Sequence, residues 1–515
     1  FDLSTFTINR SAAGGTLSVA SGATLKIGGT NTLPQSYTTI TLNVNSNVEY
    51  AGANQSIDNV TYGNVITSGS GTKTVSGTMT IAGDLTIGAG TTVDAANVQT
   101  TFGTGSVVTV NGTLDFTNTG GSFRTGNNQT DVITMGANGL IRTVDATGLI
   151  IANGSFVTQG GGGAWTSTSI DNNGTVEYYA GANQVVDDRN YNNLIISTTA
   201  GTKTMTLSAT SRTISGDLTI NGNAPFTFGG TNRSINLKGS WEMNSTGTYT
   251  QGTNTVNFNG SAAQEIRGTQ TTSFSNITFN NSFAGAAILM TKGATVTGTA
   301  TFTDGIVSVS SGETFAFAAG SSATGAGLNQ STDASYVVGV VQKTGNTAFT
   351  YPVGSLVTGG TGGYMPVTLS NPNNATDAYS AEYKRQSGAA MGGINSPLFG
   401  VSNCDQWDMK LVNEGGTPAS LSVTLSWDNG SACNNLGFIT STTGLTVAHF
   451  NGSTWDEAGS GTATVTGNVN AGTVRRDNIT SFSPFTIGNT TPYENPLPVK
   501  FSDVKAFEKG TANQI

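Results

Sequence analysis

Side chains that could carry out acid–base or metal chemistry are few in this chain and lie far apart in the sequence. His449 is the single histidine, and it stands between Ala448 and Phe450 in a stretch that predicts a strand. A histidine in such a position ordinarily points outward or covers a sheet edge. A Ser-His-Asp set would have no second histidine to use, and a typical zinc site would lack ligands. We therefore predict no catalytic residue and no metal ligand.

The closest group of acidic and basic residues is Asp187-Asp188-Arg189. Glycan-cleaving enzymes need paired carboxylates, or basic residues beside acids, along a groove. As a site, this segment would bind Ca²⁺ or a sugar; as structure, it would be a charged loop between repeating units. We favour the structural interpretation and keep the site as the alternative.

Two further segments raise the question of Ca²⁺, namely Asp171-Asn172-Asn173-Gly174 and Asp428-Asn429-Gly430. Carboxylate and carbonyl oxygens are the ligands that Ca²⁺ prefers. Asp or Asn followed by Gly is also the ordinary signature of a tight turn. We expect turns at both places, with Ca²⁺ as a possible ligand and no other cofactor.

Aromatic residues are the better candidates for contact with a ligand. Trp165 follows four glycines, and Tyr178 and Tyr179 are neighbours in a predicted strand. Consecutive side chains of a strand point to opposite faces, so one of the two tyrosines is expected to face outward. Trp165, Tyr178 and Tyr179 are our candidate ligand-surface residues, with packing in the core or on a flank as the alternative.

The chain has two cysteines, Cys404 and Cys433. Their spacing suits one disulfide within a β domain, and closing a loop of about 30 residues would be worth roughly 3–4 kcal/mol. Two buried free thiols are the alternative. A chain rich in Thr and Asn, with almost no helix-forming segment, also favours an oxidising, extracellular setting.

Composition narrows the classes of function. Charged residues make up 10% of the 515 residues, against about 25% in ordinary globular proteins, and the net charge is −9. Because no basic run occurs, nucleic acid and anionic membranes are not expected partners. Because no stretch of about 18 apolar residues occurs, no transmembrane segment is predicted.

The element that must position these residues is a short strand that returns about every eight residues. Apolar residues at i and i+2 point to one face of a strand, and Gly, Asn, Ser or Asp follow in the turns. The pattern is clear at Leu17/Val19, Leu25/Ile27, Met79/Ile81, Leu85/Ile87, Val108/Val110, Leu114/Phe116, Leu218/Ile220, Phe226/Phe228, Ile235/Leu237, Trp241/Met243 and Val256/Phe258.

A longer set of motifs recurs in the same order, with variable spacing. The first copy consists of Val48-Glu49-Tyr50-Ala51-Gly52-Ala53-Asn54-Gln55, Tyr62-Gly63-Asn64, Gly71-Thr72-Lys73-Thr74 and Gly83-Asp84-Leu85-Thr86-Ile87. The second consists of Val176-Glu177-Tyr178-Tyr179-Ala180-Gly181-Ala182-Asn183-Gln184, Tyr191-Asn192-Asn193, Gly201-Thr202-Lys203-Thr204 and Gly216-Asp217-Leu218-Thr219-Ile220. A weaker third copy opens at Val256 and includes Gln264-Glu265-Ile266. A solenoid tolerates such spacing, because extra residues can bulge from one turn without breaking the stack.

We therefore predict an all-β protein. Residues 1–330 are expected to form a right-handed parallel β-helix, a solenoid with degenerate repeats and coils of roughly two dozen residues. Residues 331–400 are expected to form a β-rich transition module, and 401–489 an immunoglobulin-like β-sandwich. Residues 490–515 would be a Pro-containing linker and the start of a further module. The core of the sandwich is expected at Trp407, Trp427 and Trp455, with a sugar-stacking platform as the alternative.

The end of the chain resembles a known group of proteins. Ser483-Pro484-Phe485-Thr486-Ile487-Gly488, followed by Pro496-Leu497-Pro498-Val499-Lys500-Phe501, resembles a junction in large cell-surface proteins of Bacteroidetes. There the junction precedes a fibronectin-like module and a sorting domain read by the type IX secretion system. The preceding sandwich of that group is similar to the segments Tyr351-Pro352-Val353-Gly354, Tyr364-x-Pro366-Val367 and Trp407-Asp408, and its solenoids resemble the Gly-Asp-Leu-Thr-Ile coils.

This resemblance implies surface display, adhesion or extracellular assembly, and it supplies no catalytic residue. The sorting domain itself lies outside this sequence. We expect a processed product that has lost its targeting segment before Phe1 and that continues beyond Ile515.

The function that these observations favour is that of a non-enzymatic, extracellular structural or adhesive protein, a solenoid stalk or fibre subunit at a bacterial surface. Its expected partners are itself, neighbouring surface proteins and polysaccharides. The alternative is a carbohydrate-binding or carbohydrate-active β-helix protein that resembles a polysaccharide lyase. A binder of ice or crystal faces would need threonines in registered rows, and the irregular spacing of Thr80, Thr86 and Thr92 speaks against it.

Overall fold

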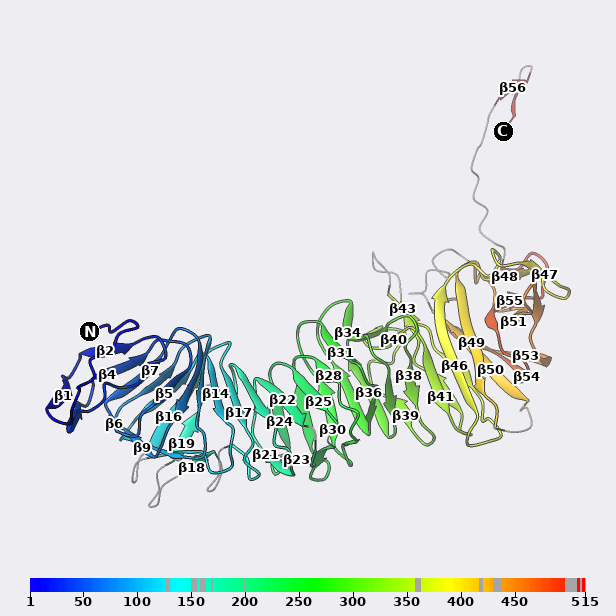
Figure 1. Cartoon of the computed structure of the whole chain (residues 1–515). Coiled ribbons are helices and arrows are strands. Elements are labelled where there is room, and N and C mark those ends of the chain that lie inside the picture. Colours follow the sequence, from blue (N-terminus) through cyan, green and yellow to red (C-terminus); the bar gives the residue numbers. More distant parts are fainter. Residues whose placement is uncertain are drawn as a thin grey trace. The chain divides into compact units, whose positions relative to one another are not determined.

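The computed structural model of the chain consists of β-strands, with no helix among the residues that it describes (Figure 1). The chain divides into two compact units, Phe1–Ser282 and Phe283–Ile515. The described residues are 1–515 without 126–129, 150–154, 158–163, 168–169, 199, 224, 357–362, 416–419, 429–437, 496–506, 510–511 and 515.

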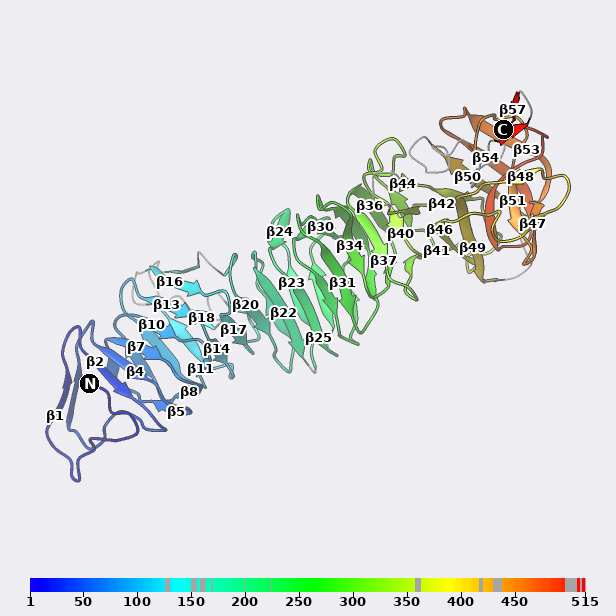
Figure 2. The ribbon, with the colours of Figure 1, turned by 90° about the horizontal axis from the view of Figure 1, so that it is seen from above.

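The first unit is a β-solenoid, as predicted, in which successive coils add parallel strands to the same sheets. Figure 1 shows these strands stacked along the unit, and Figure 2 shows them from above. Sheets I, II and III form the first coils. Sheet I contains β2 (Thr24–Ile27), β4 (Asn47–Tyr50), β7 (Asn64–Thr67), β10 (Leu85–Ile87), β13 (Val107–Val110), β16 (Thr130–Met135) and β19 (Ala164–Ser167). Sheet III contains β6 (Thr61–Tyr62), β9 (Met79–Ile81), β12 (Gln99–Phe102), β15 (Ser122–Arg124) and β18 (Phe156–Val157).

Sheet II runs through the whole unit, whereas sheets I and III give way to sheets IV and V. Sheet II contains β5 (Gln55–Ile57), β8 (Gly71–Val75), β11 (Thr91–Asp94), β14 (Thr113–Phe116), β17 (Leu140–Thr143), β20 (Thr175–Tyr178), β22 (Asn193–Thr198), β25 (Leu218–Gly222), β28 (Trp241–Met243) and β31 (Gln264–Gly268). Sheet IV contains β21 (Gln184–Val186), β23 (Lys203–Thr206), β26 (Phe226–Gly229) and β29 (Tyr249–Thr250). Sheet V contains β24 (Ser211–Ile214), β27 (Ser234–Leu237), β30 (Thr255–Phe258) and β33 (Asn276–Asn280); the unit also holds β1 (Thr16–Val19), β3 (Thr39–Leu42) and β32 (Thr272–Phe274).

The alternation of apolar and polar residues explains why the chain coils in this way. In β10, Leu85 and Ile87 are buried while Thr86 between them is partly exposed. Leu85 is in register with Val65 of the preceding coil and with Val108 of the next. Each such side chain is worth roughly 1.5–3 kcal/mol when it is fully buried. The apolar positions therefore form an internal stack, and the threonines between them face outward.

The motif copies sit on different sheets, although their order is the same. Tyr50 ends β4 of sheet I, whereas Tyr178 ends β20 of sheet II. Gln55 begins β5 of sheet II, whereas Gln184 begins β21 of sheet IV. The second copy therefore starts one sheet later than the first, with its tyrosine on sheet II and its glutamine on the first strand of sheet IV.

The second unit begins with parallel strands and then changes to antiparallel ones. β38 pairs with β41 in parallel, and β41 pairs with β46 in antiparallel fashion. The parallel strands are β34 (Ala286–Met290), β35 (Ala294–Val296), β36 (Thr299–Asp304), β37 (Ile306–Val309), β38 (Phe315–Phe317), β39 (Ser322–Thr324), β40 (Val337–Val338) and β41 (Val341–Thr344).

Two larger sheets follow in this unit. Sheet VI has the order β41, β46 (Ala378–Arg385), β49 (Asp405–Asn413), β55 (Pro484–Asn489), β51 (Leu445–Phe450), β52 (Thr454–Glu457) and β47 (Gly393–Ile394), with β48 (Gly400–Val401) beside β55. Sheet VII has the order β42 (Phe349–Tyr351), β45 (Val367–Leu369), β50 (Leu421–Trp427), β54 (Gly472–Ile479) and β53 (Ser460–Gly467). Short pairs are formed by β43 (Gly354–Ser355) with β44 (Gly363–Tyr364), and by β56 (Phe507–Lys509) with β57 (Ala512–Gln514).

The changes of strand pattern lie at other positions than those predicted from the sequence. Parallel pairing within the second unit continues to β41 at Val341–Thr344, beyond the expected end of the solenoid at residue 330. Strands of 331–400 pair directly with strands of 401–489, since β46 pairs with β49 and β45 pairs with β50. The transition module and the sandwich thus share both large sheets, and an immunoglobulin-like strand order stays a prediction. Of residues 490–515, predicted as a linker and the start of a further module, 496–506, 510–511 and 515 lie outside the described part of the chain.

The three tryptophans expected in the core of this unit are buried there. Trp407, Trp427 and Trp455 are each fully buried. Each indole N–H donates to a backbone carbonyl, with distances of 2.9 Å to Met365, 2.9 Å to Asn468 and 2.7 Å to Gly388. Their indole faces are therefore not available as a platform for stacking a sugar.

Candidate functional site

Trp165 does not form a ligand surface, and this prediction is wrong. Its side chain is buried, its indole N–H donates to the Phe123 carbonyl at 3.1 Å, and its ring packs edge-on against Phe102 and Phe156. Phe116 completes the same aromatic cluster. The cluster lies where sheets I and III end, and there it fills the interior of the solenoid.

Tyr178 and Tyr179 point to opposite faces, as predicted, but only Tyr179 lies on the outer one. Tyr178 is fully buried, and its hydroxyl lies 2.8 Å from that of Tyr191. Tyr178 is therefore wrong as a ligand-surface residue and belongs to the core. Tyr179 is partly exposed and remains a candidate, although its ring is already covered by the Arg142 guanidinium at 4.2 Å.

Tyr179 is part of a charged cluster on the outer side of sheet II, which we call the Arg142 cluster: Asp115, Arg142, Glu177 and Tyr179. Arg142 forms ion pairs of 2.9 Å with Asp115 and 2.6 Å with Glu177, which belong to the coils on either side. The Tyr179 hydroxyl donates to Asp115 at 2.5 Å. Burial raises the pKa of the Asp115 carboxyl, while Tyr179 and Arg142 act in the opposite direction. The two ion pairs connect neighbouring coils, and the Arg142 guanidinium is bound by a carboxylate on each side.

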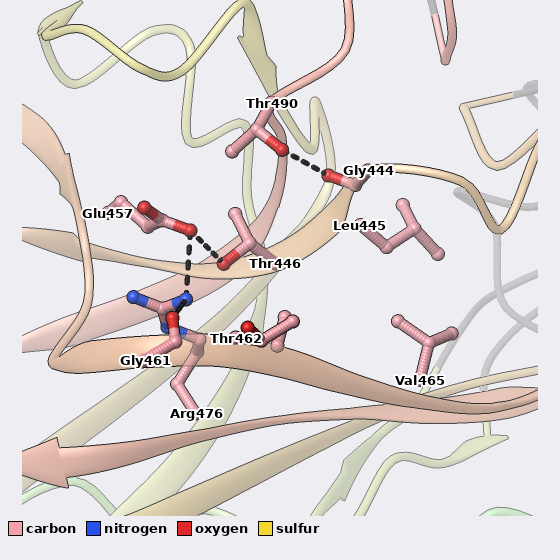
Figure 3. Close-up of a pocket in the computed structure, with 10 residues that line it drawn as sticks. Gly444, Leu445, Thr446, Glu457, Gly461, Thr462, Val465, Arg476 and Thr490 are labelled. Carbon is pink, nitrogen blue, oxygen red and sulfur yellow. Dashed lines mark hydrogen bonds and ion pairs between the residues drawn. The ribbon is translucent and has the colours of Figure 1, made fainter.

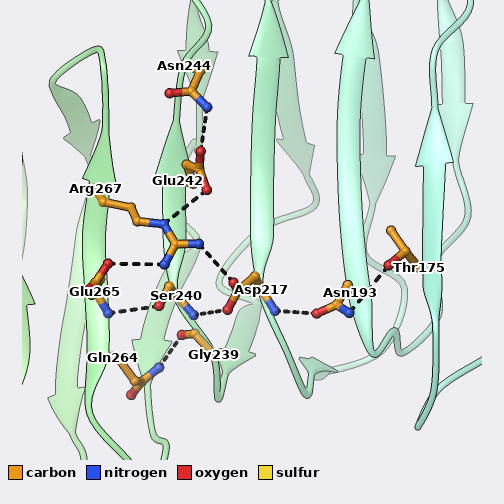
Figure 4. Close-up of polar contacts among 10 residues, drawn as sticks. All are labelled: Thr175, Asn193, Asp217, Gly239, Ser240, Glu242, Asn244, Gln264, Glu265 and Arg267. Carbon is orange, nitrogen blue, oxygen red and sulfur yellow. Dashed lines mark hydrogen bonds and ion pairs between the residues drawn. The ribbon is translucent and has the colours of Figure 1, made fainter. Parts of the chain in front are cut away.

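Arg267 repeats this arrangement farther along sheet II (Figure 4). Its guanidinium lies 3.1 Å from each of Asp217, Glu242 and Glu265. We call these four residues the Arg267 cluster. Asn244 donates to Glu242 at 2.7 Å, and this bond is the largest contribution that lowers the pKa of Glu242. The arrangement can hold neighbouring coils in register, because each carboxylate comes from a different strand or turn.

Figure 4 also shows a chain of polar contacts that crosses successive coils. Asn193 accepts from the backbone N–H of Asp217 at 2.9 Å, and Asp217 accepts from the N–H of Ser240 at 2.7 Å. Ser240 in turn accepts from the N–H of Glu265 at 3.1 Å. Each side chain satisfies a backbone donor of the next coil where a strand begins. The Asn of the Tyr-x-Asn motif and the Asp of the Gly-Asp-Leu-Thr-Ile motif thus have a structural role.

The glutamine of each motif copy has the same role inside the solenoid. Gln55, Gln184 and Gln264 are buried. The side-chain amide of Gln55 donates to the Asn31 carbonyl at 2.8 Å, that of Gln184 to Asp145 at 2.9 Å, and that of Gln264 to Leu237 at 2.9 Å. A buried carbonyl without a donor is costly, so each glutamine stabilises the contact between its coil and the preceding one.

The lysine of the Gly-Thr-Lys-Thr motif is buried in both copies. Lys73 Nζ donates to the carbonyls of Gly52 at 2.7 Å and Ala53 at 2.5 Å. Lys203 Nζ donates to the carbonyls of Ala180 at 2.7 Å and Ala182 at 2.8 Å. Burial lowers the pKa of both lysines, to about 8 for Lys203. The acceptors are carbonyl oxygens of the Ala-Gly-Ala turn, so the lysine closes that turn.

The candidate Ca²⁺ or sugar site at Asp187-Asp188-Arg189 has the contacts of a structural loop. Asp187 accepts from the backbone N–H of Leu149 at 3.0 Å. Asp188 is bound by Arg212 at 2.7 and 2.9 Å, and this guanidinium is the main reason that the pKa of Asp188 lies far below its usual range. Arg189 pairs with Asp171 at 3.2 Å. The side chains of Asp187, Asp188 and Arg189 thus bind different partners and do not point toward a common centre.

The possible Ca²⁺ segments agree better with turns where the structure describes them. Asp171 is paired with Arg189, and Gly174 has a φ of 67°, the left-handed conformation that a tight turn needs. Asn429 and Gly430 lie outside the described residues. Among the described residues, no three His, Cys, Asp or Glu side chains are grouped so that they could hold a metal ion.

His449 and Cys404 lie in sheet VI and beside it. The Nε2 atom of His449 is 2.7 Å from the Ser483 hydroxyl, its ring packs on Phe485, and burial lowers its pKa. Cys404 is buried and disulfide-bonded. Cys433 lies outside the described residues, and its pairing with Cys404 stays a prediction.

A cavity of about 270 Å³ in the second unit was not foreseen from the sequence (Figure 3). It is lined by strands of both large sheets. Arg476, which is 4% exposed, pairs with Glu457 at 3.0 Å and donates to the Ala458 and Gly461 carbonyls. Thr446 donates to the same Glu457 carboxylate at 2.9 Å. Arg and Glu stand far apart in the sequence, so no local signal marks this cavity.

A second cavity, of about 220 Å³, lies on the first unit and has a polar lining. Arg124, Asp145 and Gln99 contribute a guanidinium, a carboxylate and an amide, and Ser122 contributes a hydroxyl. These are the groups that bind sugar hydroxyls and carboxylates. The residues come from β12, β15 and the turn after β17, so only the coil register brings them together.

The outer faces of the solenoid carry threonines in registered rows. On sheet IV, Thr204, Thr227 and Thr250 are aligned. The same holds for Thr86, Thr109 and Thr134 on sheet I, Thr72, Thr92 and Thr113 on sheet II, and Thr61, Thr80 and Thr101 on sheet III. Thr80, Thr86 and Thr92 lie on three different sheets, so their irregular spacing gave no valid argument against rows.

Comparisons of this chain with family models, with curated proteins and with solved structures found no match. No helix suited to spanning a bilayer occurs in the part of the chain that the structure describes.

Proposed function

We propose that this chain is a non-enzymatic scaffold of the extracellular space, a structural or adhesive protein at a bacterial surface. The observation that carries the proposal is the shared role of the repeated motif residues. In both copies the glutamine, the lysine and the tyrosine pair bond to backbone carbonyls or to each other inside the solenoid. The recurring part of the sequence therefore serves the stacking of coils.

The outer rows of threonine are the proposed contact surface. Neighbouring strands of a sheet lie about 4.8 Å apart, so a row offers hydroxyl and methyl groups at a regular spacing. A polymer or a solid surface can engage many such weak contacts at once, and avidity then replaces affinity at a single site. Polysaccharide, mineral surfaces and neighbouring surface proteins are the partners that suit this chemistry.

The finer assignments belong to the same proposal. A right-handed coil is supported by the general preference for right-handed crossovers between parallel strands. An immunoglobulin-like sandwich in the second unit is supported by two largely antiparallel sheets with buried tryptophans. Export by type IX secretion is supported only by the resemblance of the segments around Ser483 and Pro496 to those of Bacteroidetes surface proteins.

Co-sedimentation of the full chain with insoluble polysaccharides and mineral particles tests the adhesive role. Replacing Thr204, Thr227 and Thr250 by Glu should abolish binding if sheet IV is the contact face, since the change adds three exposed charges and removes the hydroxyl row. The same replacement of Thr61, Thr80 and Thr101 tests the row of sheet III separately, and Lys238→Glu, at an exposed position outside the rows, is the control. Absence of binding to every surface tested, together with the absence of rods or filaments in electron micrographs, would refute the proposal.

Glycan binding or cleavage at the cavity of Arg124 and Asp145 is the second candidate, because a guanidinium and a carboxylate line one polar hollow there. Calorimetry with uronate oligosaccharides and an assay for new reducing ends test it on the full chain. Heat of binding or turnover that is lost in Arg124→Ala would favour this candidate over the scaffold.

A further inference from the structure

Strand β53 is an edge strand of unusual composition. It is the last strand of sheet VII, and among the described residues only β54 pairs with it. Its sequence, from Ser460 to Gly467, is SGTATVTG, without a charged residue or a proline. Charges, prolines and short length are the usual means by which proteins keep such edges from pairing. After an irregularity between Ser460 and Thr464, the strand keeps a regular register with β54 to its end.

The hydrogen-bond pattern shows which backbone groups of β53 point away from its neighbour. The hairpin is closed by a bond of 2.9 Å from Asn468 N to Ala471 O. Because bonded and non-bonded pairs alternate in an antiparallel ladder, Thr466 and Thr464 bond to β54. Val465 and Gly467 therefore direct their N–H and C=O groups toward the open edge.

The side chains of β53 alternate in an equally regular way. Thr462, Thr464 and Thr466 are exposed, whereas Ala463 and Val465 are partly buried. Ala463 and Val465 line the cavity of Figure 3, and so does Thr462 at the irregular start of the strand. Arg476 donates to the Gly461 carbonyl at 2.5 Å and so fixes the start of the strand. The start of the edge strand is thus fixed by the buried Arg476, and its exposed face carries threonines.

We propose that β53 pairs in antiparallel fashion with β53 of a second copy of this chain. The alternation Thr-Ala-Thr-Val-Thr reads alike in both directions, so a two-fold pairing sets threonine opposite threonine and Ala or Val opposite Ala or Val. Threonine pairs across strands are favourable. The strand itself carries no charge to repel its copy, and the nearest exposed charges, Arg475 and Asp477, already pair at 2.8 Å. Such an interface is isologous and closes after two copies.

This inference does not rest on the adhesive role, and its test uses the full chain. Sedimentation velocity over a concentration series should show a monomer–dimer equilibrium. Thr464→Lys should remove the dimer, because like charges then face each other across the new pair. Thr464→Asp should do the same, and a mixture of the two variants should recover a dimer, because the opposite charges now meet. Thr350→Lys, an exposed position on β42 at the other edge of sheet VII, is the matched control and should leave the dimer unchanged.

Three results would overturn the proposal. The first is a monomer at every concentration of the unaltered chain. The second is a dimer that survives Thr464→Lys, which would place the interface elsewhere. The third is a mixture of the Lys and Asp variants that stays monomeric although each keeps the thermal midpoint of the unaltered chain.

Discussion

The hydroxyls of Tyr178 and Tyr191 meet at 2.8 Å inside the solenoid, and those of Tyr50 and Tyr62 meet at the same distance one motif copy earlier. The Tyr191 proton goes to the Asp187 carbonyl at 2.9 Å, so Tyr178 must be the donor within its pair. The Tyr62 proton goes to the Asp58 carbonyl at 2.9 Å in the same way. The two motifs that contain these tyrosines are therefore tied together by one short relay of hydrogen bonds.

Removing either hydroxyl of the Tyr178–Tyr191 pair should lower stability. We expect Tyr191→Phe to cost about 1–3 kcal/mol, since a buried acceptor and a buried donor lose their partner together. The double variant with Tyr178→Phe should cost less than the sum of the two single changes, because both singles remove the same bond. Urea unfolding of the four proteins measures this coupling, and Tyr493→Phe, at a fully exposed residue, is the control. Strictly additive effects would show that the two hydroxyls do not interact.

Replacement of the buried lysine by methionine tests the closure of the Ala-Gly-Ala turn. Lys203→Met keeps the length of the side chain but removes the donor to the Ala180 carbonyl. We expect a loss of about 1–3 kcal/mol, seen as a lower midpoint of urea unfolding. Lys238→Met, at an exposed position of the same unit, should change the midpoint little. Equal effects of the two substitutions would contradict a special role for Lys203.

The same lysine should give a pH dependence in the alkaline range. Burial lowers the pKa of Lys203 to about 8, whereas a lysine of the unfolded chain has a pKa of about 10.4. Between these values the unfolded state holds more protons, so the free energy of unfolding should rise with pH. Above about pH 10 the raised pKa of Tyr178 acts in the opposite direction. The rise in the free energy of unfolding from pH 8 to 10 should be smaller in Lys203→Met, and smaller still when Lys73 is also changed to Met. If the altered and unaltered proteins show the same rise over this interval, the buried lysines are not its cause.

Arg267 pairs with three carboxylates, and its removal should make the effect on stability sensitive to salt. Partly exposed ion pairs are worth little, about 0–1 kcal/mol, so we expect Arg267→Gln to lower the unfolding free energy by roughly that amount at low ionic strength. The remaining repulsion among Asp217, Glu242 and Glu265 is screened by salt. The difference from the unaltered protein should therefore shrink as NaCl is added. Lys238→Gln serves as the comparison, and a difference that is independent of salt would speak against the cluster.

The solenoid could be predicted because the inside–outside alternation is a property of each strand alone. The alternation in Leu85-Thr86-Ile87 is enough to predict which residues face inward, and the same pattern recurs in successive coils. The opposite orientation of Tyr178 and Tyr179 followed from the same rule. Trp165 could not be placed in this way, because the glycines before it say nothing about which face of β19 it occupies.

Contacts between coils could not be predicted, because they depend on the register between strands far apart in the sequence. Arg142 reaches Asp115 in one neighbouring coil and Glu177 in the other, and coil lengths vary between them. The threonine rows were missed for the same reason, since Thr80, Thr86 and Thr92 are close in sequence but lie on different faces. The pairing of Arg476 with Glu457 across two strands of the second unit is another register effect.

Asp405 should make the second unit less stable as pH rises through the acidic range. Its carboxyl is fully buried and accepts from the Tyr383 hydroxyl at 2.5 Å; burial raises its pKa to about 6. Between pH 4 and 6 the unfolded chain has released this proton while the folded chain still holds it, so the free energy of unfolding should fall over this interval. Below pH 4 the stabilisation by the buried, protonated carboxyl is fully present, and above pH 6 it is fully lost. Asp405→Asn keeps an acceptor for Tyr383 but cannot titrate, so its urea midpoint should lack this fall. If the two proteins follow the same curve from pH 4 to 6, Asp405 is not the titrating group.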